Sequence, residues 1–441
     1  MFSSKKGVLV VGYGVSGKAA FEFLRNNGHD VLLFDDGKID VPNRVTAINW
    51  TAIDLIVKSP SVPCFGSNCH KIIREANERS LPVLSVFDVF KLYNPAARMV
   101  AITGTNGKST TTALVYHILK NSNFSAAIGG NIGIPYFSMP KSDIYVLEMS
   151  SYELTSSKYL DFEISCVLNI DPDHLQFHLT FSNYIAAKHL ALDHAKIKIF
   201  SIEDKLTTSK YSFNENAIRI SIANIPEANY YVREGVLIDS GEAVIDLSNL
   251  EELRGAHNHQ NVLCAYAICR KFGLPPKEIA LSIASFKALP HRMKIVKRIG
   301  NVLFVNDSKG TNPVSSAKAL ATFVGHKIFW LAGGRSKKIE PLPFVSHYLQ
   351  GVHKIYLFGE AEDEFDNIFK SYAKTAKCGS MESALNAAFI ESMKMEDLSV
   401  ILFSPMGTSF DQFANFEERG DKFISLVNKL LIETIYDCNC D

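Results

Sequence analysis

The chain has 441 residues, of which 47% are hydrophobic and 21% are charged, an ordinary globular composition that can fill several cores. Basic and acidic residues number 46 each, so the formal net charge is zero and nothing indicates a nucleic-acid-binding surface. The eight cysteines are scattered, and no apolar stretch approaches the length of a membrane helix. We therefore expect a soluble, cytoplasmic protein of about three domains that binds neither nucleic acid nor membrane.

Short apolar runs rich in β-branched residues alternate with helical patterns through most of the chain. The run Val8–Val11 ends in glycines and lacks a small-residue cleavage site, so it is interpreted as a first strand and not as a signal peptide. Continuous apolar strands separated by helices are typical of parallel α/β sheets that are covered on both faces. The other expected strands are Val31–Phe34, Leu55–Val57, Met99–Ile102, Ile144–Leu147, Cys166–Ile170, Val302–Val305, Ile328–Leu331, Ile355–Phe358 and Val400–Phe403.

Two positions divide this α/β chain into three predicted domains. Tyr93-Asn94-Pro95 precedes a new strand, and Leu289-Pro290 follows a helical stretch. The predicted domains are therefore residues 1–92, 93–289 and 290–441. The more polar stretch from Lys205 to Leu253 is expected to form short strands within the middle domain.

A glycine-rich turn follows the first strand. Its sequence is Gly12-Tyr13-Gly14-Val15-Ser16-Gly17, and the second strand ends at Asp35. This spacing fits the dinucleotide-binding fingerprint, in which an acidic residue stands about twenty positions after the glycines. Taken alone, the segment favours a nicotinamide-dependent oxidoreductase. The same physics binds any pyrophosphate, including that of a UDP-sugar.

The strongest local signal is Gly104-Thr105-Asn106-Gly107-Lys108-Ser109-Thr110, which follows the expected strand Met99–Ile102. Glycines let the backbone approach phosphate oxygens closely, and the N–H groups of a helix that starts at about Thr110 would cradle them. Lys108 can neutralise charge on a transferring phosphoryl group, and the Ser109 hydroxyl can ligate Mg²⁺. An ordinary glycine-rich turn is the alternative, but a lysine followed by two hydroxyl residues favours nucleotide binding.

Polar residues follow two further strands of the middle segment. Glu148 comes directly after Ile144–Leu147, and Asp171-Pro172-Asp173-His174 follows Cys166–Ile170. Because ligands of parallel sheets bind beyond the carboxyl ends of the strands, both segments should open onto the edge that carries the phosphate loop. A carboxylate and an imidazole beside a triphosphate are suitable Mg²⁺ ligands. The alternatives are a carboxylate at a helix N-terminus and, for His174 with His178, a solvated turn.

The short phosphate loop, with Thr-Asn between its glycines and Ser-Thr after its lysine, resembles that of the Mur ligases. Further matching segments extend the resemblance over essentially the whole chain: Gly129–Gly133, Asp173-His174 with Ala186-Ala187-Lys188, Arg254–Asn261, Asn306–Pro313 and Ser404–Gly420. Within the last segment, Gln412 and Asn415-Phe416-Glu417 are similar to the D-glutamate-adding member. The Asn-Pro-Arg motif of the member that adds diaminopimelate or lysine is not found.

The resemblance implies a Rossmann-like N-terminal domain, a central P-loop ATPase-type domain and a Rossmann-like C-terminal domain. It also implies site residues. ATP would be bound by the phosphate loop with Asn258, Arg292 and Asp307. The UDP-substrate would be bound by Val15, Ser16, Gly17, Asn131 and His174. D-glutamate would be bound by Thr311, Lys337, Ser409 and Phe416. Two Mg²⁺ ions would be held by Ser109, Glu148, His174 and a carbamylated Lys188.

Each of these residues also has a simpler interpretation. Lys188 alone is a surface lysine on an amphipathic helix, Asn131 a turn residue, and Asn258 a helix cap. The first domain departs from the family at Asp36-Gly37, where Thr or Arg is usual, and at Ser61, where Gly is usual. The departures bear on the contacts to uridine.

The resemblance implies an ATP-dependent ligase of peptidoglycan precursor synthesis, monomeric, that adds D-glutamate to UDP-N-acetylmuramoyl-L-alanine through an acyl phosphate. Lys108, Glu148, His174 and Lys188 would act at the reacting groups. The alternatives are an NAD-dependent oxidoreductase, a non-catalytic nucleotide-binding switch, and a ligase of the same superfamily that adds another amino acid.

Overall fold

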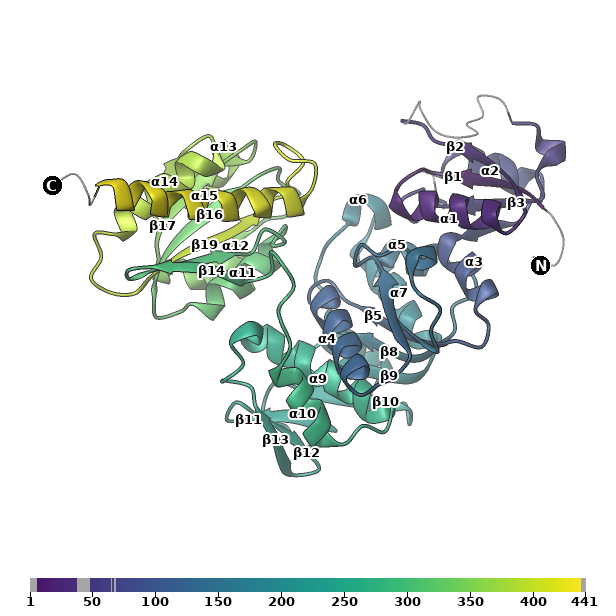
Figure 1. Ribbon diagram of the computed structural model, residues 1–441, viewed down its shortest axis with the longest axis horizontal. Helices are drawn as coiled ribbons and strands as arrows, with labels where there is room; N and C mark the ends of the chain where they lie inside the picture. Colours follow the sequence, from purple (N-terminus) through teal and green to yellow (C-terminus); the bar gives the residue numbers. More distant parts are fainter. Residues whose placement is uncertain (1–5, 38–47, 65, 67–68, 438–441) are drawn as a thin grey trace. The chain divides into compact units, whose positions relative to one another are not determined.

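The computed structural model describes residues 6–37, 48–64, 66 and 69–437. Its strands form three sheets, each accompanied by helices (Figure 1). The chain divides into two compact units: Met1–Asn249 with Asn258–Phe286, and Leu250–His257 with Lys287–Asp441. The first unit holds two of the sheets and the second unit holds the third. The α/β class is thereby confirmed, whereas the three domain boundaries stay a prediction.

The first sheet is entirely parallel, with the strand order β2-β1-β3-β4. Its strands are β1 (Gly7–Val11), β2 (Asp30–Phe34), β3 (Leu55–Lys58) and β4 (Val83–Ser85), and its helices are α1 (Val15–Asn26), α2 (Lys71–Glu78) and α3 (Val86–Tyr93). In the dinucleotide-binding fold the third strand lies beyond the second. Here β3 pairs with β1, and no strand of the described residues lies outside β2. This order gives no support to the oxidoreductase alternative.

The second sheet has nine strands in the order β13-β12-β11-β10-β9-β8-β5-β7-β6, and only its β11-β12 and β12-β13 pairs are antiparallel. The central strand β5 (Arg98–Thr103) lies between β7 (Ile144–Glu148) and β8 (Phe162–Val167). The remaining strands are β6 (Ala126–Gly130), β9 (Ala195–Ser201), β10 (Ala217–Ser221), β11 (Tyr230–Arg233), β12 (Val236–Asp239) and β13 (Glu242–Asp246). The helices are α4 (Lys108–Asn121), α5 (Ser151–Ser156), α6 (Leu175–His178), α7 (Phe181–Asp193), α8 (Lys205–Tyr211), α9 (Ala256–Lys271) and α10 (Pro276–Ala284).

The polar stretch from Lys205 to Leu253 does contain short strands, β10 to β13, which extend this same sheet. Two details of the region differ from expectation. The stretch begins with a helix, α8, and residues 250–257 pack with the second unit.

The third sheet belongs to the second unit and has the order β14-β15-β19-β16-β17-β18, in which only the β14-β15 pair is antiparallel. Its strands are β14 (Lys294–Ile299), β15 (Val302–Asn306), β16 (Lys327–Gly333), β17 (Val352–Phe358), β18 (Thr375–Lys377) and β19 (Ser399–Met406). The helices are α11 (Pro313–Thr322), α12 (Leu342–Val345), α13 (Glu362–Phe369), α14 (Met381–Ser392) and α15 (Phe416–Asp437).

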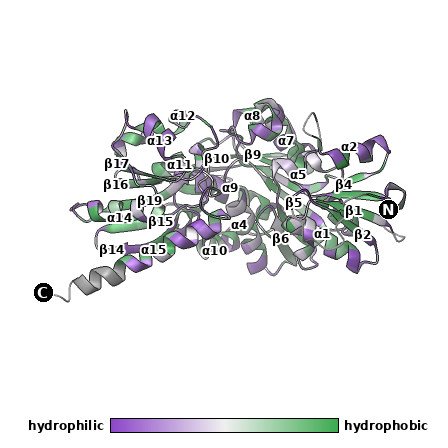
Figure 2. Cartoon of the chain, turned by 90° about the horizontal axis from the view of Figure 1, so that it is seen from above, coloured by the Kyte–Doolittle hydropathy of each residue, from purple (hydrophilic) through white to green (hydrophobic). Residues whose placement is uncertain are grey.

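The central strands of each sheet are apolar and buried, and the hydrophilic residues lie mainly in the surrounding helices and loops (Figure 2). The first and second sheets share one hydrophobic core, to which α3 contributes Phe87 and Phe90. The Phe90 ring meets that of Tyr145 edge to face at 4.9 Å between centroids. At the start of α3, the buried Asp88 carboxylate accepts hydrogen bonds from the backbone N–H groups of Lys158 and Tyr159. The two sheets are therefore packed as one body.

The ten expected strands are present, but one ends early. The run Cys166–Ile170 was expected to be a strand throughout, whereas β8 ends at Val167. Leu168 still donates its N–H to Thr103 O, and the side chain of Asn169 turns to the phosphate loop instead of continuing the ladder. Over the parts of the chain that are described, no helix is both long and apolar enough to cross a membrane.

Candidate active site

The phosphate loop connects the end of β5 to the start of α4. The helix begins at Lys108, two residues earlier than expected, with Gly107 as its N-cap in the left-handed region (φ 87°). A Cβ atom at Gly107 would lie 2.3 Å from the Asn261 side-chain oxygen. Both the positive φ and the close approach require glycine there.

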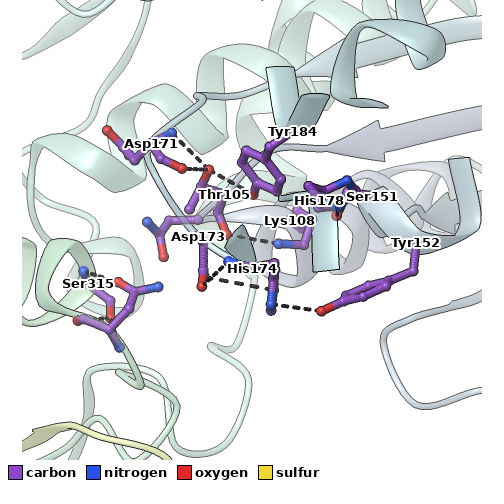
Figure 3. A network of polar contacts seen from close by, with 12 residues as sticks. Thr105, Lys108, Ser151, Tyr152, Asp171, Asp173, His174, His178, Tyr184 and Ser315 are labelled. Atoms are coloured by element: carbon purple, nitrogen blue, oxygen red, sulfur yellow. Dashed lines mark hydrogen bonds and ion pairs between the residues drawn. The ribbon is translucent and has the colours of Figure 1, made fainter. Parts of the chain in front are cut away.

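The segment that follows β8 and a tyrosine of α7 hold this loop by hydrogen bonds. The Asn106 N–H donates to Asn169 Oδ1 at 2.9 Å, and Asn169 Nδ2 returns a hydrogen bond to Asn106 O at 3.1 Å. The Thr105 hydroxyl lies 3.0 Å from Asp171 O and 3.1 Å from the Tyr184 hydroxyl (Figure 3). Asn106 Nδ2, by contrast, is a buried donor without a hydrogen-bond partner. A buried donor of this kind in a glycine-rich loop suits an anionic ligand.

Two lysine ammonium groups meet at the loop carbonyls. Lys108 Nζ donates to Gly104 O and to Thr105 O, each at 2.9 Å. Lys188 Nζ, from α7, donates to Gly104 O at 2.8 Å and to Thr103 Oγ1 at 3.1 Å. Burial and then the nearby Lys108 charge hold the pKa of Lys188 well below its usual range, although Asp173, Glu148 and Glu153 oppose this. Lys188 is therefore not the surface lysine that its helix pattern alone indicates.

Glu148 ends β7 beside the loop, and both of its oxygens are engaged. It pairs in register with Ile102 and is buried. The Ser109 hydroxyl donates to Oε2, and Asn131 Nδ2 donates to Oε1 at 2.8 Å. Residues of the predicted ATP and UDP-substrate loops thus share one carboxylate. A carboxylate and a hydroxyl are hard oxygen donors of the kind that Mg²⁺ takes, so this pair fits the predicted metal ligands.

His174 precedes α6 in the left-handed region (φ 54°). Its Nδ1 lies 3.1 Å from the Tyr152 hydroxyl, and its Nε2 lies 3.8 Å from Asp173 Oδ2 (Figure 3). His178 instead lies 2.9 Å from the Ser151 hydroxyl. The two histidines therefore have different hydrogen-bond partners. Among the residues described, no group of three or more His, Cys, Asp or Glu side chains could hold a metal.

The start of α9 supports the loop from behind. Asn258 lies inside this helix, so the helix-cap interpretation is wrong. Asn258 Oδ1 accepts from Asn261 Nδ2 at 2.9 Å, and Asn261 Oδ1 accepts from the Thr111 hydroxyl at 3.2 Å. Gln260 donates to Leu168 O at 2.9 Å. Asn258 is thus linked to α4 through Asn261.

In the first sheet, Val15, Ser16 and Gly17 form the first turn of α1, and the Val15 side chain is exposed. A Cβ at Gly17 would meet Gly12 O at 1.9 Å, so glycine is needed for the close packing of this turn. Asp35, the acidic residue of the fingerprint, accepts the Tyr13 N–H at 2.6 Å and the Gly37 N–H at 3.0 Å. Its carboxylate therefore braces the glycine-rich turn itself.

In the second unit, Asp307 follows β15 and is buried. Its carboxylate accepts hydrogen bonds from the Ser404 hydroxyl at 2.8 Å and from the Met293 N–H at 3.3 Å. The second bond places Arg292, the neighbour of Met293 in the chain, close to Asp307. Burial raises the pKa of Asp307 to about 7, despite the hydrogen bond from Ser404 and the opposing charges of Arg292 and Arg419.

The predicted acceptor residues lie on neighbouring loops of this unit. Arg335 and Thr408 exchange backbone hydrogen bonds at 2.9 and 2.8 Å, which joins the segments that carry Lys337 and Ser409. Phe416 opens α15, accepts the Ser308 hydroxyl at its carbonyl (2.8 Å), and has Lys309 Nζ 3.7 Å from its ring centroid. Thr311 stands directly before Asn312, which caps α11. These four residues therefore lie on the segments that follow β15, β16 and β19.

Several supporting residues were not identified as site residues from the sequence. Asn169, Asn261 and Tyr184 hold the phosphate loop, and Arg419 lies fully buried in the second unit. The sequence signal for Asn261 and Arg419 was their place inside matched motifs. For Asn169 and Tyr184 there was none, because each acts through a long-range contact.

The chain also matches known proteins. Residues 102–269 match the Mur ligase middle domain. The UDP-N-acetylmuramoylalanine–D-glutamate ligase of Rickettsia bellii is 32% identical, with 97% of this chain and 98% of the relative covered. The ligase of the same name from Nitrobacter hamburgensis is 35% identical, with 96% and 97% covered.

Solved structures agree in fold. UDP-N-acetylmuramate-alanine ligase MurC of Thermotoga maritima has a TM-score of 0.61 at 18% identity, with 96% of this chain and 99% of that chain covered. MurF ligase of Thermotoga maritima, in complex with ADP, has a TM-score of 0.62 at 18% identity, with 98% and 96% covered. This chain belongs to the Mur ligases and, within them, to the family of UDP-N-acetylmuramoylalanine–D-glutamate ligases.

Proposed function

We propose that this chain uses ATP to join D-glutamate to UDP-N-acetylmuramoyl-L-alanine in peptidoglycan precursor synthesis. The observation that carries the proposal is the convergence of Lys108, Ser109 and Glu148 at the carboxyl ends of β5 and β7, inside the segment that matches the Mur ligase middle domain. We further propose that the chain acts as a cytoplasmic monomer on these small-molecule substrates.

The chemistry explains why these residue types are needed. A carboxylate is a poor acylating agent at neutral pH, so the alanyl carboxylate first takes the γ-phosphoryl group of ATP, which gives an acyl phosphate and ADP. The amine of D-glutamate then attacks, and orthophosphate leaves. Phosphoryl transfer depends on positioning and on charge neutralisation, which Lys108 and the N–H groups at the start of α4 would supply.

Mg²⁺ is implied by the family, and Ser109 with Glu148 would hold it, with His174 as the predicted ligand of a second ion. Bound there, the metal would neutralise phosphate charge. Asn131, Val15, Ser16 and Gly17 would orient the UDP-substrate. We assign His174 to the substrate's reacting end. It would act there either as the ligand of the second ion or, when it holds no metal, as the base that takes the proton of the attacking amine.

The proposed carbamylation of Lys188 rests on its burial beside the loop. An uncharged amine reacts with CO₂, and the lowered pKa of Lys188 raises the fraction of uncharged amine at neutral pH. We expect phosphate release to fall severalfold in CO₂-depleted buffer and to recover on addition of bicarbonate. Lys188→Met should show no response to bicarbonate. Equal activity of the unsubstituted chain with and without CO₂ would rule the modification out.

A phosphate-release assay tests the function. We expect orthophosphate to appear only when Mg²⁺, ATP, UDP-N-acetylmuramoyl-L-alanine and D-glutamate are all present, and other amino acids in a panel to give background rates. Release driven equally by another amino acid would assign a different acceptor. Absence of release with every amino acid would refute the proposal.

A further inference from the structure

Lys58 is a fully buried lysine that the proposed reaction does not use. It is the last residue of β3, and its side chain is 1% exposed. Its ammonium group donates to Ser59 O at 3.2 Å, to Val62 O at 2.9 Å and to the Ser156 hydroxyl at 2.9 Å. None of these three acceptors is a carboxylate.

Burying an ammonium group in this way is costly. The ammonium group loses its hydration, and neutral oxygens return only part of what that hydration contributed. Burial accordingly lowers the pKa of Lys58, against partial opposition from Cys64, Asp88 and others. A methionine would fill most of the same space without this cost, but it could not make the three hydrogen bonds.

On one side, Lys58 closes the short loop 59–62, which packs against the glycine-rich turn of the first sheet. The Ser59 N–H donates to Val11 O at 2.9 Å, and its hydroxyl donates to Gly12 O at 2.7 Å. A Cβ at Gly17 would lie 2.4 Å from the Ser59 hydroxyl. The position of Ser59 therefore sets the position of the Gly12–Gly17 turn.

On the other side, Lys58 contacts α5, the helix that follows strand β7 of the second sheet in the same unit. The Ser156 hydroxyl donates to Tyr152 O at 2.5 Å, and the Tyr152 hydroxyl lies 3.1 Å from His174 Nδ1. The cap of α5, Ser150, stands two residues after Glu148. Helix α5 therefore connects Lys58 to the residues at the reacting end of the site.

We propose that Lys58 is a positioning residue that holds the Gly12–Gly17 turn at a fixed place relative to Glu148 and His174. A UDP-linked substrate has its diphosphate at one end and its reacting carboxylate at the other, so it must meet both places at once. The inference rests on the proposed function. It concerns affinity for the UDP-substrate alone, because ATP and D-glutamate have no predicted contact with this turn.

Lys58→Met tests the proposal, since it keeps most of the apolar part of the side chain and removes the donors. We expect the KM for UDP-N-acetylmuramoyl-L-alanine to rise on the order of tenfold, the effect of losing about one net hydrogen bond. The KM for ATP should stay within about twofold of that of the unsubstituted chain, because the phosphate loop is untouched. Calorimetric binding of the UDP-substrate without ATP should weaken by the same factor.

Two further variants separate positioning from general stability. Lys91→Met is the matched control. Lys91, on α3, donates to Asp161 at 2.9 Å, so it too links the helices of the first sheet to the second sheet. It should leave both KM values unchanged. Ser156→Ala removes the partner of Lys58 on α5, together with the hydrogen bond of that hydroxyl to Tyr152 O, and leaves Lys58 in place. It should shift the KM for the UDP-substrate in the same direction as Lys58→Met.

The outcomes are distinct. If Lys58→Met does not fold, Ser156→Ala decides the matter. Unchanged affinity for the UDP-substrate in a folded variant, or equal rises in the KM for ATP and for the UDP-substrate, would overturn the role of Lys58 while leaving the ligase function intact. Failure of the unsubstituted chain to release phosphate would instead overturn the proposed function.

Discussion

Lys108→Met should lower D-glutamate-dependent phosphate release by about a thousandfold, the upper range for loss of one preorganised group that stabilises the transition state. Lys108 starts α4, and its ammonium group rests on the Gly104 and Thr105 carbonyl oxygens. When a phosphoryl group binds, the Lys108 ammonium group would donate to the charged phosphate oxygens in place of these carbonyl oxygens. Methionine replaces the apolar part of this side chain but cannot carry the charge.

Two measurements accompany this test. Lys120→Met changes an exposed lysine in the last turn of the same helix and should leave the rate unchanged. Calorimetry should show that Lys108→Met still binds UDP-N-acetylmuramoyl-L-alanine, because the predicted contacts to that substrate lie on other loops. Near-normal turnover by Lys108→Met would contradict the assignment of the phosphate loop.

Arg419→Met should destabilise the second unit by about 3 kcal/mol. The fully buried guanidinium donates to Ser308 Oγ, to Ser308 O and to Gly407 O at 2.8 to 3.1 Å. Burial lowers the pKa of Arg419 to about 10, so its charge is retained at neutral pH. Removing it leaves buried carbonyl oxygens without donors, each at a cost of roughly 1–3 kcal/mol, partly offset because the cation no longer has to be desolvated.

This loss is measured by urea unfolding of the full chain. The urea concentration at the midpoint of the unfolding transition of the second unit should be lower in the variant. Arg335→Met is the matched control, because Arg335 makes two hydrogen bonds to Glu360 on the surface of the same unit. Exposed ion pairs contribute little to stability, so its midpoint should hardly move. An unchanged midpoint in Arg419→Met would show that the hydrogen bonds of this guanidinium do not stabilise the unit.

Local patterns were sufficient to predict where the site lies. The strand runs around Met99–Ile102 and Ile144–Leu147 are continuous and apolar, so their places in a parallel sheet, and the polar residues at their carboxyl ends, could be predicted from sequence. Lys108, Ser109 and Glu148 meet for this reason alone. The glycine-rich turn after β1 was also predicted, although its interpretation as part of an oxidoreductase depended on a strand order that the sequence does not reveal.

What escaped prediction is the support behind the loops. Asn169 contacts Asn106 across 63 positions of the chain, and Asn261 contacts Thr111 across 150. Lys58 reads as an ordinary charged residue at the end of a strand, and only the packing of α5 against the first sheet shows that it is buried. Such contacts depend on how sheets and helices pack, which no local periodicity encodes.

One oxygen of Glu148 accepts a hydrogen bond from Ser109 and the other accepts one from Asn131, so a single side chain contacts two loops. A compound that takes the hydrogen bond of the Asn131 amide releases one oxygen of the carboxylate to which Ser109 also donates. We therefore expect binding at the two loops to be coupled, and such a coupling of binding free energies is reciprocal. The affinities of inhibitors for either loop should accordingly be compared with the natural ligand of the other loop present. Affinities measured on the unliganded protein omit the effect that this ligand has on Glu148.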